Sequence, residues 1–156
     1  MKLQLAPDIE PRLRQALRNA GRREIGGMLF AEQLAPGNFK IIDFSLDGLS
    51  GSFGHFQREP QAHANILNIF FKKTAHDFER FNYLGEWHSH PSFSVQPSVT
   101  DAATMQALVD NPSTNISFAL LLIVRLRFKF SMEYSITIFA RDVAPKHIRR
   151  FEPVNI

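Results

Sequence analysis

The sequence contains no cysteine, one tryptophan and two tyrosines among its 156 residues. The absence of cysteine excludes a disulfide scaffold, a cysteine zinc finger, an iron–sulfur cluster and a cysteine nucleophile. Long apolar runs are also missing: the longest, residues 118–124, has seven residues, whereas a membrane-spanning helix needs about 20. The N-terminal residues lack the apolar core of a signal peptide. We therefore expect a cytoplasmic protein with no membrane partner.

The composition is typical of a folded domain. A hydrophobic fraction of 44% and a charged fraction of 21% are globular values rather than those of a disordered chain. No repeat, low-complexity tract or linker divides the chain, so we expect a single domain over residues 1–156.

The net charge is slightly positive, with 18 Lys and Arg against 15 Asp and Glu. Part of the excess lies in arginines near the two ends: Arg12, Arg14, Arg18, Arg22, Arg23, Arg149 and Arg150. Nucleic-acid-binding proteins often show such clusters. No nucleic-acid motif accompanies this one, and a solvated helix face is the simpler explanation. We therefore do not expect a nucleic acid as partner.

The hydrophobic pattern predicts an α/β protein. Apolar residues at helical spacing predict three helices, over residues 7–20, 60–79 and 98–109. Apolar or alternating runs predict strands over residues 25–31, 39–46 and 82–90, and two more between 116 and 139. Helices that alternate with strands indicate a mixed β-sheet flanked by helices.

Local signals refine this pattern. Gly21 is suited to end the first helix, and the adjacent Gly26 and Gly27 indicate a close backbone approach or a bulge in the following strand. Residues 47–60 and 91–97 are expected to form loops. From Asp142 onward we expect a short irregular segment. The turn between the last two strands cannot be placed, because that stretch lacks the usual turn residues.

The segment from Gly85 to Asp101, GEWHSHPSFSVQPSVTD, concentrates residues suited to bind a metal. Alternate residues of a strand face the same side, so His88 and His90 point into the same space. Neutral imidazole is the commonest metal ligand in proteins. Asp101 follows a proline-bounded loop and falls in the first turn of the next helix. Two histidines and a carboxylate are a ligand set of catalytic zinc that leaves one position for water.

Each of these residues also has an ordinary structural interpretation. A histidine in a strand often only packs or faces solvent. Ser98 and Asp101, three residues apart before an apolar helix, fit a variant of the capping box, with Ser98 as the N-cap. The two roles are compatible, because a cap that fixes the helix start can also direct Asp101 toward a metal.

The combined pattern is more specific than its parts, and from average residue usage it is expected by chance on the order of 10⁻⁷ per position. His88-Ser89-His90-Pro91, followed after six residues by Ser98 and after two more by Asp101, resembles the signature of the JAMM metalloproteases, also called the MPN+ or JAB domain. Glu24-Ile25-Gly26-Gly27 is similar to the family's upstream glutamate motif. The resemblance covers about residues 9–140 and implies an MPN/JAB fold with a layout like that of cytidine deaminases.

The resemblance also implies a role for each residue of the signature. His88, His90 and Asp101 would bind Zn²⁺, which lowers the pKa of its water to about 7 and polarises the scissile carbonyl. Glu24 would act as general base and then deliver the proton to the leaving amine. Ser98 would help to stabilise the oxyanion. The implied activity is that of an isopeptidase or peptidase that hydrolyses an amide bond after the C-terminal tail of a ubiquitin-like protein or its conjugate.

The sequence before His88 adds context. Gly85-Glu86-Trp87-His88 resembles bacterial stand-alone JAB proteins, some encoded beside ubiquitin-like conjugation enzymes in antiphage systems, and such enzymes are possible partners. Glu86 shares the parity of His88, so it could compete for the base role or be a buried, paired carboxylate. Residues 47–58 could receive the substrate tail or be an ordinary connection. We expect Trp87 in the core.

Four other functions deserve comparison. Zinc deaminases share a related layout but use H-x-E with P-C-x-x-C, which a chain without cysteine cannot supply. Cupins place a glutamate a few residues after H-x-H, and residues 92–96 contain none. A non-catalytic MPN-type scaffold and a DNA-associated zinc protein remain alternatives. Metal content tests the scaffold, and salt-dependent DNA binding tests the DNA-associated protein.

Overall fold

The computed structural model describes residues 1–46, 60–128 and 131–153, and the side chains of 60–62 are outside this description. The helices are α1 (Ile9–Ala20), α2 (Pro60–Lys73) and α3 (Val99–Asp110). The strands are β1 (Lys2–Leu5), β2 (Gly26–Ala35), β3 (Asn38–Phe44), β4 (Phe81–Ser89), β5 (Phe118–Arg127), β6 (Ser131–Ala140) and β7 (Val143–Ile148). None of the helices in these ranges is long and apolar enough to cross a membrane.

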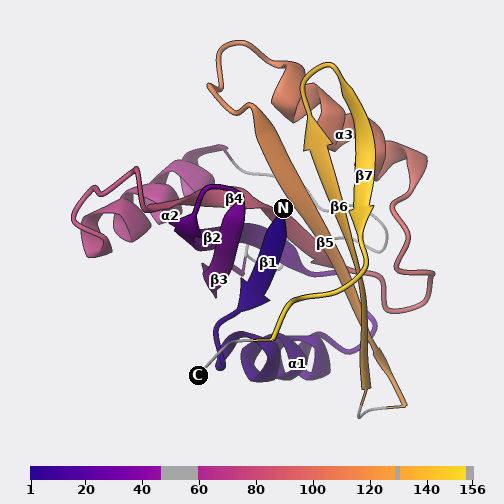
Figure 1. Ribbon diagram of the computed structural model, residues 1–156. Helices are drawn as coiled ribbons and strands as arrows, with labels where there is room; N and C mark the ends of the chain where they lie inside the picture. Colours follow the sequence, from indigo (N-terminus) through magenta and orange to yellow (C-terminus); the bar gives the residue numbers. More distant parts are fainter. Residues whose placement is uncertain (47–59, 129–130, 154–156) are drawn as a thin grey trace.

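The strands form one sheet in the order β1-β3-β2-β4-β5-β6-β7 (Figure 1). The pairs β1–β3 and β4–β5 are parallel, and the other four are antiparallel. The predicted mixed sheet flanked by helices is therefore confirmed. Strand β4 occupies the middle of this order, between β2 and β5, and residues 84–87 in it are buried.

Helices cover both faces of the sheet. On one face, Leu120 and Leu122 of β5 belong to the same buried cluster as Leu13 of α1. On the other, Leu121 of β5 packs with Met105 of α3. Helix α2 covers the β2 end of that second face with its own smaller cluster. Burial on both faces explains why residues 118–124 are continuously apolar, as a strand in this position requires.

Close backbone contact surrounds the start of β2. A side chain at Gly27 would collide with the backbone of Ser45, and one at Gly26 would collide with the backbone of Trp87. The close approach lets Ser45 Oγ accept a hydrogen bond from the Met28 N–H at 2.8 Å and lets the Ser45 carbonyl accept from Trp87 Nε1 at 2.9 Å. The predicted close approach at the two glycines and the predicted core position of Trp87, which is 0% exposed, are both confirmed.

Helix ends depend on local backbone conformation. Gly21 has a φ of 63° and donates its N–H to the Leu17 carbonyl, so it ends α1 as predicted. The helix predicted over residues 60–79 ends earlier, at Lys73. The reason is that Ala75 and His76 adopt positive φ values of 53° and 57°, which interrupt the helix.

The prediction of an irregular C-terminal segment was wrong, because residues 143–148 form β7 on the edge of the sheet. All but the last of these residues are exposed, and Pro145 and Lys146 are typical of protected edges. The strand β1 was not predicted, although Leu3 and Leu5 alternate. The undetermined turn between β5 and β6 begins at Phe128, whose φ is 51°. The loop predicted over 47–60 lies, up to residue 59, outside the described residues.

Candidate metal centre

The two histidines stand at the carboxyl end of β4. The register pairs His88 with Gly26 of β2 on one side and with Ile123 of β5 on the other. A Cβ at Gly26 would also press on the His88 side chain, so the glycine leaves room for the imidazole. His90 follows the last paired residue and donates its backbone N–H to the Val124 carbonyl at 3.0 Å. Neighbouring strands thus fix the backbone at both histidines.

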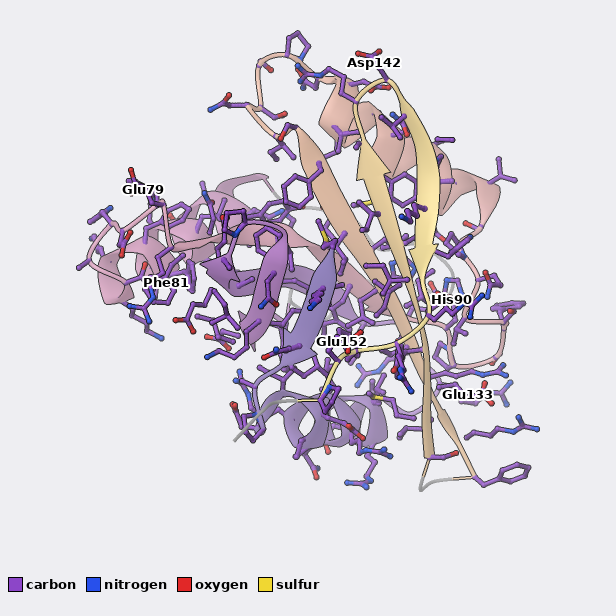
Figure 2. All side chains as sticks on the ribbon, in the orientation of Figure 1. Glu79, Phe81, His90, Glu133, Asp142 and Glu152 are labelled. Atoms are coloured by element: carbon purple, nitrogen blue, oxygen red, sulfur yellow. The ribbon has the colours of Figure 1, made fainter. Side chains whose placement is uncertain are left out.

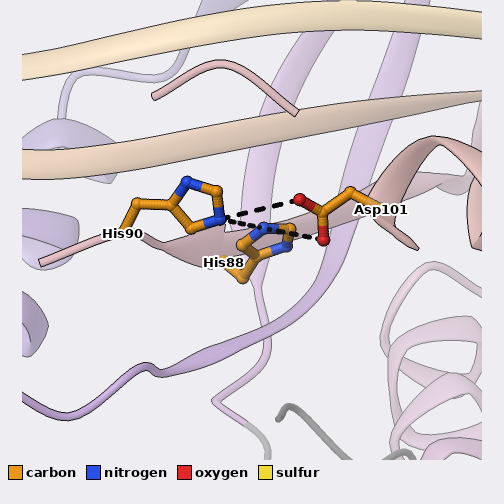
Figure 3. Close-up of side chains that lie close together, drawn as sticks. All are labelled: His88, His90 and Asp101. Carbon is orange, nitrogen blue, oxygen red and sulfur yellow. Dashed lines mark hydrogen bonds and ion pairs between the residues drawn. The ribbon is translucent and has the colours of Figure 1, made fainter. Parts of the chain in front are cut away.

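The carboxylate comes from the start of α3. Ser98 is the N-cap, and its Oγ accepts from the Asp101 N–H at 3.1 Å. In return, Asp101 Oδ2 accepts from the Ser98 N–H at 2.7 Å, so the predicted capping box is present. The cap holds Asp101 in the first helical turn, where its side chain faces both histidines (Figure 3).

The three side chains converge on one point. The Nε2 atoms of His88 and His90 are 3.1 Å apart. Asp101 Oδ1 lies 3.4 Å from Nε2 of His88, and Oδ2 lies 3.6 Å from Nε2 of His90. Ligand atoms bonded at 2.0–2.1 Å to a tetrahedral ion are separated by about 3.3 Å. These separations, in which each oxygen of Asp101 faces a different histidine, are close to that value, and this triangle of side chains could hold a divalent ion.

The surroundings keep Asp101 ionised. Burial raises the pKa of its carboxyl group, but the hydrogen bond and charge of His88 and the two hydrogen bonds of Ser98 lower it by more. The net result is a pKa well below the usual range of an aspartic acid. The side chain is accordingly a carboxylate over the whole neutral range, the form that coordinates a metal.

The orientation of His90 is set by a backbone carbonyl. Its Nδ1 lies 2.6 Å from the Ser94 carbonyl oxygen. Because a carbonyl can only accept, Nδ1 carries the proton and Nε2 offers its lone pair toward His88 and Asp101. Sequence reasoning missed Ser94, since a main-chain carbonyl leaves no signal in the residue type.

Glu24 lies in the segment that leads into β2. Ile25 donates its N–H to Ser89 Oγ at 3.0 Å, and its carbonyl accepts from the Ser89 N–H at 2.8 Å. These bonds continue the β2–β4 register beyond Gly26 to Ile25, and the half-buried Glu24 is the residue before it. Among the described side chains, the group of possible ligands contains His88, His90 and Asp101 and does not include Glu24.

Glu86 occupies a separate position on the same face. It is only 8% exposed, and Oε1 accepts a hydrogen bond from Tyr83 Oη at 3.4 Å. A cavity of about 540 Å³ is lined in part by Glu86, by Leu67 of α2 and by Leu108 of α3. Glu86 is also outside the group of possible ligands. Its burial and hydrogen bonding agree with the interpretation as a buried, paired carboxylate.

Two of the N-terminal arginines take part in ion pairs within the domain. Arg12 contacts Asp8 at 3.0 Å and Asp43 at 2.6 Å, and Arg14 contacts Glu10 at 2.5 Å. These contacts agree with the interpretation of the arginine cluster as a solvated helix face.

Known proteins were compared with this chain at the level of sequence families and of structure. No protein with a curated description matches it. A solution structure of a protein from Desulfitobacterium hafniense is similar with a TM-score of 0.70 at 18% identity, covering 96% of this chain and 94% of that one. A solution structure from Salinibacter ruber has a TM-score of 0.57 at 17% identity, covering 97% and 92%. At these identities the likeness concerns the fold alone. The sequence model described as prokaryotic homologs of the JAB domain matches residues 7–149. The chain therefore belongs to the family of prokaryotic JAB-domain proteins.

Proposed function

We propose that the protein is a zinc-dependent peptidase or isopeptidase that hydrolyses an amide bond after the C-terminal tail of a ubiquitin-like protein or its conjugate. The observation that carries this proposal is the convergence of His88, His90 and Asp101 into a triangle of metal-binding size, in a chain of the JAB family. Two imidazoles, one carboxylate and no thiolate suit zinc in a catalytic site, which keeps an open position. A complete ligand set favours this function over a metal-free scaffold.

Zinc bound by these three residues would supply Lewis acidity, which lowers the pKa of a water molecule to about 7 and polarises the amide carbonyl. Glu24 lies two residues before Gly26, which pairs with His88, and we assign it the role of general base. Its carboxylate takes a proton from the attacking water as the bond between oxygen and the carbonyl carbon forms. It then returns that proton to the amide nitrogen as the carbon–nitrogen bond breaks, because an amine is a poor leaving group without it.

Ser98 is the N-cap of α3 and is hydrogen-bonded to Asp101. Its oxygen already accepts the Asp101 N–H, and its hydroxyl proton is a further donor that can be directed at the developing oxyanion. The cap thus fixes the position of a donor as well as the position of a ligand. In this proposal Glu24 transfers the proton, Ser98 stabilises the negative charge of the oxyanion, and the three ligands hold the metal.

The proposed substrate is an extended polypeptide tail, as the resemblance to the JAMM signature implies. The proposed ligand residues lie at the end of β4 and the start of α3. The side chains of His88 and Asp101 are 13% and 19% exposed, so the site is accessible from outside. We further propose, from the resemblance of residues 85–88, that the protein acts in the bacterial cytoplasm alongside ubiquitin-like conjugation enzymes, in defence against phage.

The first test is metal content, measured by mass spectrometry on protein purified without chelator or nickel resin. We expect about one zinc per chain in the wild type and none in His88→Ala. His147→Ala is a matched control, because its ring contacts Thr137 on the β6–β7 edge. A wild type that binds no zinc, even after zinc is added, would contradict the proposal and favour a scaffold.

The second test separates catalysis from metal binding. Glu24→Gln keeps the size of the side chain but removes the base, so we expect normal zinc content and cleavage of a ubiquitin-like fusion slowed about 10²–10⁴-fold. The wild-type cleavage should stop on addition of chelator and resume with zinc. Cleavage by Glu24→Gln at the wild-type rate would exclude Glu24 as the base.

A further inference from the structure

The loop between β4 and α3 connects His90 to the cap that positions Asp101. Three successive carbonyls of this loop accept hydrogen bonds from side chains. The Phe93 carbonyl accepts from Arg125 Nη1 at 2.7 Å, the Ser94 carbonyl from His90 Nδ1 at 2.6 Å, and the Val95 carbonyl from Ser135 Oγ. Surface-loop carbonyls ordinarily bind water, so three consecutive side-chain donors indicate that this loop is held in one conformation.

The first donor is itself oriented by an ion pair. Arg125 of β5 lies directly opposite Glu133 of β6. Its Nε and Nη2 both lie 2.6 Å from Glu133 Oε2, which leaves Nη1 directed at the Phe93 carbonyl. A guanidinium held through two nitrogens has little freedom to turn. Figure 2 shows His90 and Glu133 on the same side of the molecule.

Ser135, the donor to the Val95 carbonyl, lies on the same face of the sheet as His88. His88 of β4 pairs with Ile123 of β5, and Ile123 pairs with Ser135 of β6. Paired residues of neighbouring strands share a face, so Ser135 projects to the same side as the imidazole of His88. Val95 also packs against the buried cluster that contains Ile123. The loop is therefore attached to β5 and β6 by apolar contact and by hydrogen bonds.

We propose that Arg125 and Ser135 are positioning residues of the metal centre. By holding the carbonyls of Phe93 and Val95, they fix the carbonyl between them, that of Ser94, where it accepts from His90 Nδ1. This bond keeps the proton on Nδ1 and turns Nε2 toward the metal. Neither residue contacts the ligand atoms themselves. The inference rests on the proposed metal binding and concerns how tightly, and in what geometry, the metal is held.

The test measures metal binding directly, by zinc competition with a chromophoric chelator and by the visible absorption of Co²⁺ in the same site. Arg125→Met keeps the aliphatic stem, and Ser135→Ala removes one oxygen. Loss of an outer partner of a ligand typically costs 10–100-fold in metal affinity, so we expect each variant to bind zinc about 10-fold or more weakly and to show an altered Co²⁺ spectrum. Arg125→Lys, with a single donor group, should recover part of the affinity.

Arg127→Met is the matched control. Arg127 also pairs with Glu133, at 2.8 Å, and its other described side-chain contact is the ring of Phe128 rather than a loop carbonyl. We expect its zinc affinity and Co²⁺ spectrum to match those of the wild type. The thermal midpoint of every metal-free variant is measured alongside, so that a general loss of stability is distinguished from a displaced ligand.

The possible outcomes distinguish failure of the proposed metal centre from failure of the positioning role alone. Wild-type protein that binds neither zinc nor cobalt would overturn the metal centre and this inference together. Wild-type binding with equal affinity and spectra in Arg125→Met and Ser135→Ala would overturn the positioning role alone. A lower metal-free midpoint with unchanged metal affinity would likewise show that the two residues support only the fold.

Discussion

Asp101 caps α3 and is a proposed metal ligand, and one substitution can separate these two roles. Its Oδ2 caps α3 by accepting the Ser98 N–H at 2.7 Å, while Oδ1 lies 3.4 Å from Nε2 of His88 in the ligand triangle. Asp101→Asn keeps an oxygen that can accept from Ser98 but removes the negative charge. We therefore expect this variant to fold with its helix cap and to lose most of its metal affinity.

The size of the metal effect follows from the number of ligands. Structural zinc sites with four protein ligands bind with about 10–16 kcal/mol, so one ligand contributes roughly 3–4 kcal/mol. Its loss corresponds to a fall in zinc affinity of about 10²–10³-fold, since 1.4 kcal/mol is a factor of ten. The measurement is chelator competition at pH 7, with Asp110→Asn as control, because Asp110 lies at the other end of α3 and contacts Gln106.

Asp101→Asn should have a smaller effect on the free energy of unfolding of the metal-free protein, and this effect depends on pH. The pKa of Asp101 is lowered in the folded state by His88 and Ser98 despite burial. Its charge therefore contributes stability that is present above the unfolded pKa and is lost as pH falls through the folded one. The pair is partly exposed, so we expect Asp101→Asn to cost about 1 kcal/mol at pH 7, or about 2–4 °C. The cost should shrink in acid.

Two results would refute this reasoning. Zinc affinity within about threefold of the wild type would show that Asp101 is not a ligand, because no single-ligand loss is that small. A fall of more than about 10 °C in the metal-free midpoint would show that Asp101→Asn disturbs more than the cap and the charge, since a cap contributes only about 1 kcal/mol.

Two further predictions concern the fold that supports the site. Glu32, 7% exposed, binds Lys40 at 2.7 Å and Arg80 at 2.5 Å, and their hydrogen bonds lower its pKa. Glu32→Gln should lower the free energy of unfolding by about 1–3 kcal/mol at pH 7. Urea unfolding should show this difference from the wild type shrinking below about pH 4, because a carboxylate with a lowered pKa stabilises the fold only above that range. An equal difference at pH 3 would exclude the ion pairs as its cause. Gly27→Ala would place a methyl group inside the backbone of Ser45, so thermal unfolding should show a midpoint lower by about 4–10 °C, and an unchanged midpoint would contradict the close approach.

The features predicted from sequence are those that local physics determines. The His88–His90 alternation and the Ser98–Asp101 cap depend on neighbours within a few residues, and both are present in the structure. Residues 118–124 are all apolar, which predicts that the strand is buried on both faces. Local patterns of this kind do not depend on how distant segments pair, so they are readable before the fold is known.

The features that sequence reasoning missed have weak or non-local causes. Strand β7 is exposed along its length and contains Pro145, so neither apolar alternation nor strand propensity indicates it. The end of α2 depends on the positive φ of Ala75. Alanine is a strong helix former, so the residue type gives no sign that the helix ends there. Ser135 and Arg125 contact a loop 30 to 40 residues earlier in the chain through its carbonyls. Such contacts exist only once β5 and β6 have paired.

The strand order explains why the site is assembled from segments so far apart. Because β2 runs antiparallel to β4, the start of β2 meets the end of β4, and Ile25, next to Glu24, is hydrogen-bonded to Ser89, next to His90, although 64 positions separate the bonded residues. Because β5 runs parallel to β4, the connection between them must cross the sheet, and α3 begins this crossover beside the histidines. The proposed base and the carboxylate of Asp101 thus belong to segments that follow different connections of one central strand. A substitution that shifted the β2–β4 register by one residue would turn Glu24 to the opposite face while leaving the ligand triangle intact.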